Sequence, residues 1–187
     1  VFVAFVKKIE SFSFRNGKKN WAFDLNGARV WSGFSFDKET KTIAVVTSNL
    51  INLWGKTNIS PDYSNSLVLI NSETGKLKCV FKDVKHDHWD LDMVGSPIFT
   101  NITFKNKLIK AVYAFSKTGN TFVIDVNKCE FVFKEKNNFQ IIKTETPING
   151  QTYADHQIKI LKPEPLLDQK YNLEEYLKTI KDKKKIA

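Results

Sequence analysis

Three copies of one short pattern recur along the chain at a nearly constant spacing. They read SFSFRNGKKNW (11–21), LINSETGKLKC (69–79) and VIDVNKCEFVF (123–133), so their starts lie 58 and 54 residues apart. Each copy has a strand-like run, a polar turn and a second strand-like run that closes on an apolar residue. A repeat of this length predicts one four-stranded blade of a β-propeller, in which neighbouring blades bury each other's faces.

We number the positions of the repeat from one to eleven. The third position is polar, the seventh is glycine in two copies, and the eleventh is expected to pack between neighbouring blades. In chain order, the third position holds Ser13, Asn71 and Asp125, the seventh holds Gly17, Gly75 and Cys129, and the eleventh holds Trp21, Cys79 and Phe133.

Short β-rich runs lie between turn signals along most of the chain, among them VFVAFV, ARVWSGFSF, TIAVVT, SLVLIN and KAVYAFS. Many short strands would also suit a sandwich or a barrel, and the repeat favours a propeller. We therefore predict an all-β fold, with a partial propeller over residues 1–165. Residues 166–187 are predicted to hold the end of a PEPLLDQ linker and a short C-terminal helix, from about 173 to 184, with Asn172 as its N-cap.

The net charge of +9 comes almost wholly from lysine, since Arg15 and Arg29 are the only arginines. The lysines are scattered except for KDKKK at 181–185, so we interpret them as a solvated surface. Nucleic-acid binders usually concentrate arginine, and we expect no nucleic-acid partner. No apolar run approaches the ~20 residues that span a bilayer. The opening VFVAFVKK has its basic residues on the wrong side for a signal peptide and predicts a strand.

The two cysteines, Cys79 and Cys129, fit no zinc-site spacing. They occupy different positions of the repeat, the eleventh and the seventh. We therefore expect their Cα atoms to lie too far apart for a bridge, and we predict two free thiols.

The repeat resembles the tryptophan-docking motif A-x-D-x-x-T-G-K-x-x-W of the pyrroloquinoline quinone (PQQ) dehydrogenases, which are eight-bladed propellers that oxidise alcohols or sugars in the bacterial periplasm. HDHWDLD (86–92) resembles the H-D-x-W-D-x-D of that family, and SKTGNTFVIDVN (116–127) resembles its K-T-G-x-x-x-V-L-D-R. Segment 31–49 resembles the family's W-G-x-x-x-x-D-x-x-x-x-x-x-x-x-x-G-N stretch, and segment 62–76 resembles the stretch that leads into its next docking motif. The resemblance runs in order over about residues 10–135, and four motifs in order are a specific signal.

The resemblance implies roles for five residues. Trp31 would form the floor under the planar quinone, because an indole can cover its face by stacking. Lys117 would bind the quinone oxygens and stabilise negative charge as the quinone is reduced. Asp90 matches the carboxylate that takes the proton of the substrate hydroxyl. Asn49 and Asp90 would bind a metal together with Asp92, which matches a lanthanide ligand of some relatives; the ion is calcium or another hard cation, such as a lanthanide or magnesium.

The segment HDHWDLD contains other candidates. His86, Asp87 and Trp89 are expected to hold the loop, and the two histidines lack a third ligand nearby for a metal site. On an extended WDLD, Asp90 and Asp92 would share one face, about 6–7 Å apart along the strand. Only one of them can lie beside the reacting carbon. Because the resemblance matches Asp90 to the family's base, Asp90 is predicted to be the base, and neither Asp87 nor Asp92 is expected to replace it.

As a whole, the resemblance implies a portion of a periplasmic PQQ-dependent alcohol or sugar dehydrogenase, or a reduced relative of one, that passes electrons to a cytochrome or a membrane quinone. At this period the chain makes about three blades of eight, so the isolated chain is expected to be inactive. The alternative is a non-catalytic PQQ-like propeller that serves as a scaffold for protein–protein interaction. Such a scaffold would keep docking repeats but would have no reason to keep Trp31, Asn49, Asp90 and Lys117 together.

Overall fold

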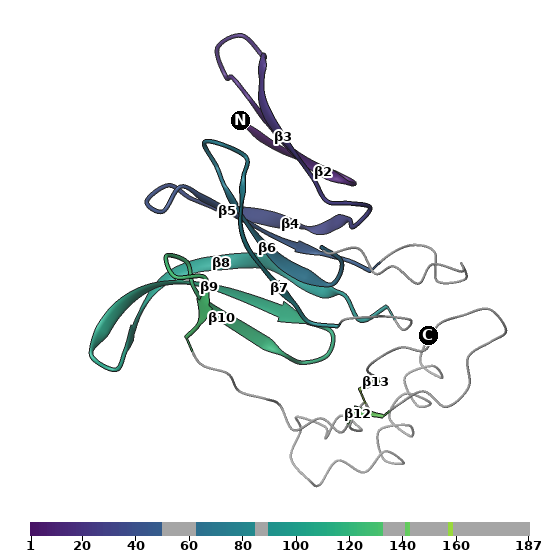
Figure 1. The fold of residues 1–187 in the computed structure, drawn as a ribbon, viewed down its shortest axis with the longest axis vertical. Coiled ribbons are helices and arrows are strands. Elements are labelled where there is room, and N and C mark those ends of the chain that lie inside the picture. The colour runs from purple at the N-terminus through teal and green to yellow at the C-terminus, as the bar shows by residue number, and fades with distance from the viewer. Residues whose placement is uncertain (50–62, 85–89, 133–140, 143–156, 159–187) are drawn as a thin grey trace, which may run out of the picture.

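The computed structural model describes residues 1–49, 63–84 and 90–132, together with two short strands at 141–142 and 157–158 (Figure 1). These residues form strands and turns and contain no helix, as the all-β prediction requires. The predicted linker and C-terminal helix lie outside the described residues.

Apart from one short two-stranded pair, the described strands form three antiparallel sheets that follow one another along the chain (Figure 1), and we name them blades 1, 2 and 3. Blade 1 comprises β1 (Phe2–Phe5), β2 (Lys8–Phe12) and β3 (Lys19–Asp24). Blade 2 comprises β4 (Val30–Asp37), β5 (Thr42–Thr47), β6 (Ser66–Asn71) and β7 (Leu77–Lys82). Blade 3 comprises β8 (Met93–Phe104), β9 (Lys107–Ser116), β10 (Thr121–Asp125) and β11 (Glu130–Phe131), and β12 (Ile141–Ile142) pairs separately with β13 (Gln157–Ile158). Sheets whose strands pair in chain order, one after another along the chain, are typical of propeller blades, as the repeat predicts.

Blade 2 is covered on both faces, which explains why β5 and β6 are nearly continuous apolar runs. Successive side chains of a strand point to opposite faces, so each strand supplies both neighbouring cores. One core lies between blades 1 and 2, and the other lies between blades 2 and 3. From β5 and β6, the residues that face blade 1 are Ile43, Val45, Val68 and Ile70, and those that face blade 3 are Ala44, Val46, Leu67 and Leu69.

Each repeat forms the hairpin between the last two strands of its blade, and all three hairpins share one turn. In each, the N–H of the seventh residue donates to the C=O of the third at 2.9 Å. The seventh residues Gly17, Gly75 and Cys129 have φ values of 69°, 69° and 57°. This left-handed region favours glycine, which explains the two glycines. Asn71 and Asp125 at the third position accept two further backbone N–H groups through their side chains, which stabilises the turn.

The eleventh position of one blade packs on the seventh position of the next. Trp21 of blade 1 lies against Gly75 of blade 2, and a methyl group at residue 75 would lie 2.6 Å from the indole ring. The indole Nε1 of Trp21 also donates to the carbonyl of Ser72 at 3.0 Å. Glycine at residue 75 therefore serves two purposes, because it adopts the left-handed turn and leaves room for the indole.

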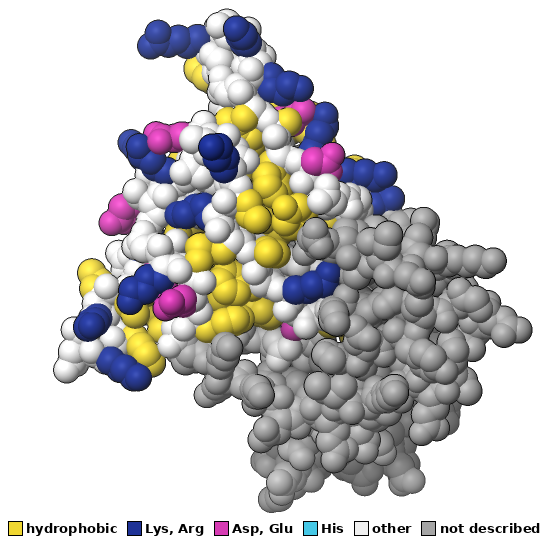
Figure 2. Space-filling view, in the orientation of Figure 1, with side chains coloured by type: hydrophobic (Ala, Val, Ile, Leu, Met, Phe, Trp, Pro, Cys, Tyr) yellow, Lys and Arg dark blue, Asp and Glu magenta, His cyan; other side chains and the backbone are white. Residues whose placement is uncertain are grey.

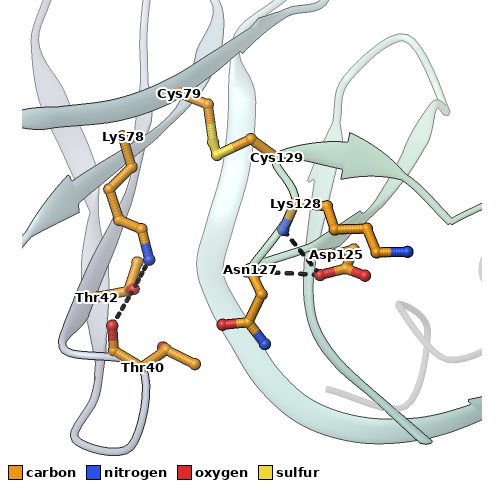
Figure 3. Close-up of a disulfide and its surroundings, with 8 residues drawn as sticks. All are labelled: Thr40, Thr42, Lys78, Cys79, Asp125, Asn127, Lys128 and Cys129. Carbon is orange, nitrogen blue, oxygen red and sulfur yellow. Dashed lines mark hydrogen bonds between the residues drawn. A yellow bond between two sulfur atoms is a disulfide. The ribbon is translucent and has the colours of Figure 1, made fainter.

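At the boundary between blades 2 and 3 the same two positions hold Cys79 and Cys129, and they form a disulfide (Figure 3). Their Cα atoms lie 5.9 Å apart. The prediction of two free thiols was wrong, because positions that differ within one repeat meet when they come from successive blades. The disulfide takes the place that the contact between Trp21 and Gly75 holds at the first boundary.

We expect the disulfide to be replaceable by the aromatic contact. Cys79→Ala/Cys129→Ala should lower the free energy of unfolding by about 4 kcal/mol, the loop-entropy value for a bridge of this span. Cys79→Trp/Cys129→Gly should recover part of that loss, because it copies the Trp21–Gly75 pair and frees residue 129 from a strained φ. Urea unfolding of the full-length protein, with and without a thiol reductant, measures the difference.

Cys79→Trp alone is the matched control, since the Cβ of Cys129 would then stand where a Cβ at residue 75 would meet the Trp21 ring. It should be the least stable of the three variants. A Trp/Gly variant no more stable than the double alanine variant would show that the disulfide does not occupy a docking position.

Candidate active site

The first strands of blades 2 and 3, β4 and β8, each contain a bulge at the boundary between the two blades. In β4 the pairing register shifts across residues 31–33, and in β8 it shifts across residues 95–97. Gly33 has a φ of 99°, and a methyl group there would lie 2.6 Å from the Oγ of Ser96. The Ser96 hydroxyl donates to the carbonyl of Ser32 at 3.0 Å, so the two bulges are joined. Bulges re-aim side chains and are common beside active sites.

Trp31 lies in the β4 bulge and presents its ring at the surface. Its side chain is half-exposed, at 51%, although its Nε1 donates to the carbonyl of Met93 at 3.0 Å. The ammonium of Lys117, in the turn between β9 and β10, lies 5.1 Å from the centre of the indole. An anchored aromatic face beside a cation favours a planar ligand that carries negative charge.

Lys117 joins the indole to two carboxylates. Its Nζ donates to Asp90 at 2.9 Å and to Asp92 at 3.0 Å, and its backbone N–H donates to the carbonyl of Asp92 at 2.9 Å. The other oxygen of Asp92 accepts the backbone N–H of Asn49 at 2.7 Å. Trp31 and Asn49 come from blade 2, whereas Asp90, Asp92 and Lys117 come from blade 3. The structure thus brings together all five residues that the sequence nominated.

The segment around Asp90 is not the extended strand expected from the sequence. Asp90 has a φ of 60°, in the left-handed region, and β8 begins only at Met93. The two carboxylates still face the same ammonium, and Asp90 is the more accessible, with 61% of its side chain exposed against 6% for Asp92. The predicted loop-holding residues His86, Asp87 and Trp89 lie outside the described residues.

Their surroundings shift the pKa values of the two carboxyl groups in opposite directions. The hydrogen bond from Lys117 holds the pKa of Asp90 below its usual value. Burial raises the pKa of Asp92, although the bonds from Asn49 and Lys117 act in the opposite direction. Burial alone would lower the pKa of Lys117, but its bonds to Asp90 and Asp92 outweigh burial and raise it. Asp90 is therefore the carboxylate that is both ionised and open to solvent.

The donor set fits a quinone and, in part, a hard cation. The indole of Trp31 and the ammonium of Lys117 would suit an anionic planar group.

Asn49 is buried, at 6% exposure, and its Nδ2 has no hydrogen-bond partner among the described residues. Asp90 and Asp92 add carboxylate oxygens. Calcium takes six to eight oxygen ligands, and no group of three or more His, Cys, Asp or Glu side chains able to hold a metal occurs in the described ranges, so these residues supply part of a coordination shell.

Sequence reasoning missed the residues that support the site. The carbonyl of Met93 anchors the indole of Trp31, and the side-chain amide of Asn65 donates to the carbonyl of Leu91 at 3.3 Å beside Asp90. Asp83 accepts bonds from the turn that carries Lys117. These bonds cross between segments far apart in the chain, so no local pattern signals them. Gly33 inside a strand-like run was a signal for its bulge.

The surface is mixed in character. Figure 2 shows lysine and arginine side chains spread around the visible face, with acidic side chains among them and apolar side chains between. Within the described residues no helix has the length and apolar character needed to cross a membrane.

Comparison with known proteins identifies the family. Residues 6–138, more than half of the chain, match the model of the PQQ glucose/ethanol/alcohol dehydrogenase β-propeller domain. The chain belongs to this family of quinoprotein dehydrogenases.

Quinoprotein glucose dehydrogenases are among the curated relatives. The chain is 28% identical to quinoprotein glucose dehydrogenase A of Acinetobacter calcoaceticus over 80% of its own length and 22% of that protein. It is 29% identical to the Escherichia coli (strain K12) quinoprotein glucose dehydrogenase over 66% of its length and 18% of that protein. The crystal structure of the quinohemoprotein alcohol dehydrogenase from Comamonas testosteroni matches 68% of this chain and 24% of that one, with a TM-score of 0.58 and 20% identity, and this likeness shows the fold. The chain thus spans about a fifth of the curated relatives it matches.

We expect Lys117→Met to raise the pKa of Asp90, because the hydrogen bond from Lys117 is the main cause of its low value. Carbon-13 NMR of the aspartate carboxyl groups during a pH titration measures the change. The sign follows from charge, since losing a cation disfavours the carboxylate.

Lys110→Met is the matched control. Lys110 bonds Asp37 at 2.9 Å across the same blade boundary, so its loss should raise the pKa of Asp37 and leave that of Asp90 unchanged. An Asp90 pKa that is the same with and without Lys117 would contradict the charge arrangement described above.

Proposed function

We propose that the chain is part of a PQQ-dependent dehydrogenase that oxidises alcohols or sugars. The observation that carries this proposal is the meeting of Trp31, Asn49, Asp90 and Lys117 at one blade boundary within a chain of this family. These residues come from four separate stretches of the sequence. A scaffold needs blades that pack, and packing does not require an exposed indole beneath an ammonium.

Each residue has a task that its surroundings suit. Trp31 covers one face of the quinone and excludes water from it, and Lys117 donates to the quinone oxygens. Asp90 accepts the proton of the substrate hydroxyl, since it is ionised and exposed. When bound, the quinone supplies the acceptor of the hydride that leaves the alcohol carbon, and a cation supplies Lewis acidity. The substrate then leaves as a carbonyl compound, with its proton on Asp90.

The cation is proposed to be calcium or another hard ion, such as a lanthanide or magnesium. Asn49 would supply its amide oxygen, and Asp90 and Asp92 would supply carboxylate oxygens. Asp92 already accepts one bond from Asn49 and one from Lys117, so its oxygens are held in place before any ion binds. Preorganised ligands of this kind favour binding.

We propose a periplasmic location and transfer of electrons to a cytochrome or a membrane quinone. The disulfide between Cys79 and Cys129 supports an oxidising compartment, because disulfides rarely persist in the cytosol.

Asp90→Asn should lower turnover of alcohol or sugar by about 100-fold or more in the full-length protein, since it keeps the shape of the base and removes its basicity. PQQ should remain bound, because Asp90 is not part of the aromatic floor. Dye-linked oxidation and PQQ content together measure the two effects.

Asp92→Asn is the matched comparison, as it removes a charge two residues along the chain. We expect it to change the dependence on added metal more than the proton transfer, because its carboxylate is buried. Near wild-type turnover by Asp90→Asn, together with loss of turnover in Asp92→Asn at saturating metal, would move the base to Asp92.

Trp31→Ala should weaken PQQ retention more than Lys117→Ala does, because the indole covers a whole ring face and the lysine makes only a few polar contacts. PQQ content after dialysis measures the order. Trp21→Phe is the control, since Trp21 lies between blades 1 and 2 and its loss should leave PQQ content unchanged. Wild-type retention in both site variants would favour the non-catalytic scaffold.

A further inference from the structure

Asp83 follows β7 at the end of blade 2 and reaches across to blade 3. Its carboxylate accepts the hydroxyl of Thr118 at 2.8 Å and the side-chain amide of Asn120 at 2.6 Å. These two residues lie in the turn between β9 and β10, and Lys117 is the first residue of that turn. We propose that Asp83 is a positioning residue that fixes Lys117 for the quinone. The proposal rests on the role of Lys117 given above.

The turn is short and strongly hydrogen-bonded. The N–H of Gly119 donates to the carbonyl of Ser116 at 3.0 Å, and the N–H of Ser116 donates to the carbonyl of Asn120 at 3.2 Å. The hydroxyl of Thr118 is buried and also bonds the hydroxyl of Ser116. These bonds restrict the backbone on both sides of Lys117. The hydrogen bonds of Asp83 to Thr118 and Asn120 therefore also fix the backbone of Lys117, from which its side chain extends.

Asp83 is suited to hold this turn because a carboxylate accepts hydrogen bonds, and both of its partners donate them. The lysine side chain has a flexible four-carbon stem and does not fix its own ammonium. Its ammonium must lie correctly above Trp31, which belongs to blade 2. Asp83 also belongs to the blade 2 segment, so it ties the lysine turn to the blade that carries the indole.

The same segment supports the acidic side of the site. The N–H of Asp83 donates to the carbonyl of Asn65 at 2.9 Å, and the side-chain amide of Asn65 donates to the carbonyl of Leu91. Leu91 lies between Asp90 and Asp92 in the chain. The backbone between the two partners of the Lys117 ammonium is thus bonded to Asn65, which in turn bonds the backbone of Asp83.

A double-mutant cycle on the full-length apoprotein tests the proposal, with PQQ as the probe and equilibrium dialysis as the measurement. Asp83→Ala should weaken PQQ binding about 10-fold, a coupling usual for residues in one hydrogen-bond network. In a Lys117→Ala background the same change should have almost no effect, because the residue to be positioned is absent. Equal weakening with and without Lys117, or no weakening in either, would overturn the proposal.

Two further variants separate positioning from general stability. Asp83→Asn/Asn120→Asp exchanges donor and acceptor, keeps an acceptor for Thr118, and should restore most of the binding that Asp83→Asn alone loses. Lys110→Ala removes a different link across the same boundary, to Asp37 and Glu39, and should lower the unfolding midpoint without changing PQQ affinity. Weaker PQQ binding by Lys110→Ala would show that Asp83 acts only through stability.

The cycle also separates this proposal from the proposed function. If Lys117→Ala by itself leaves PQQ affinity unchanged, the quinone role of Lys117 fails, whatever Asp83 does. If Lys117→Ala weakens binding and Asp83→Ala does not, the quinone role stands and the positioning role of Asp83 fails. Asp83→Asn, which keeps the size of the side chain, serves in the cycle if the alanine variant does not fold.

Discussion

The contact between the eleventh residue of one repeat and the seventh residue of the next sets how neighbouring blades pack. At the first boundary an indole lies on a glycine, and at the second a disulfide joins the same two positions. Each face of blade 2 needs a neighbouring blade to cover it, since β5 and β6 carry apolar side chains on both faces. The repeat is therefore a rule for packing between blades as much as a pattern within one blade.

The candidate site depends on that packing because its parts belong to two blades. Trp31 and Asn49 are on blade 2, while Asp90, Asp92 and Lys117 are on blade 3. A shift of one blade against the other would separate the indole from the ammonium that lies 5.1 Å above it. The paired bulges of β4 and β8, the bonds of Asp83 and the disulfide all cross this one boundary. Several independent links therefore hold the two halves of the candidate site together.

The blades could be predicted from the sequence, because a nearly constant period and short apolar runs between turn signals can be read directly from it. The site residues could be nominated because their motifs resemble those of a family. The disulfide could not be predicted by comparing positions within one repeat, since Cys79 and Cys129 meet only through the offset between successive blades. The left-handed backbone at Asp90 and the grip of Asp83 on the lysine turn arise from tertiary bonds and leave no mark in nearby residues.

The two contacts between blades, the indole on glycine and the disulfide, differ in the redox conditions that they need. The contact between Trp21 and Gly75 consists of packing and one hydrogen bond, so it holds in an oxidising or a reducing compartment. The disulfide persists only where thiols are not kept reduced. Cys129 also adopts the left-handed turn conformation that the other two repeats give to glycine. The boundary between blades 2 and 3, which carries the candidate site, is therefore the one whose packing depends on an oxidising compartment.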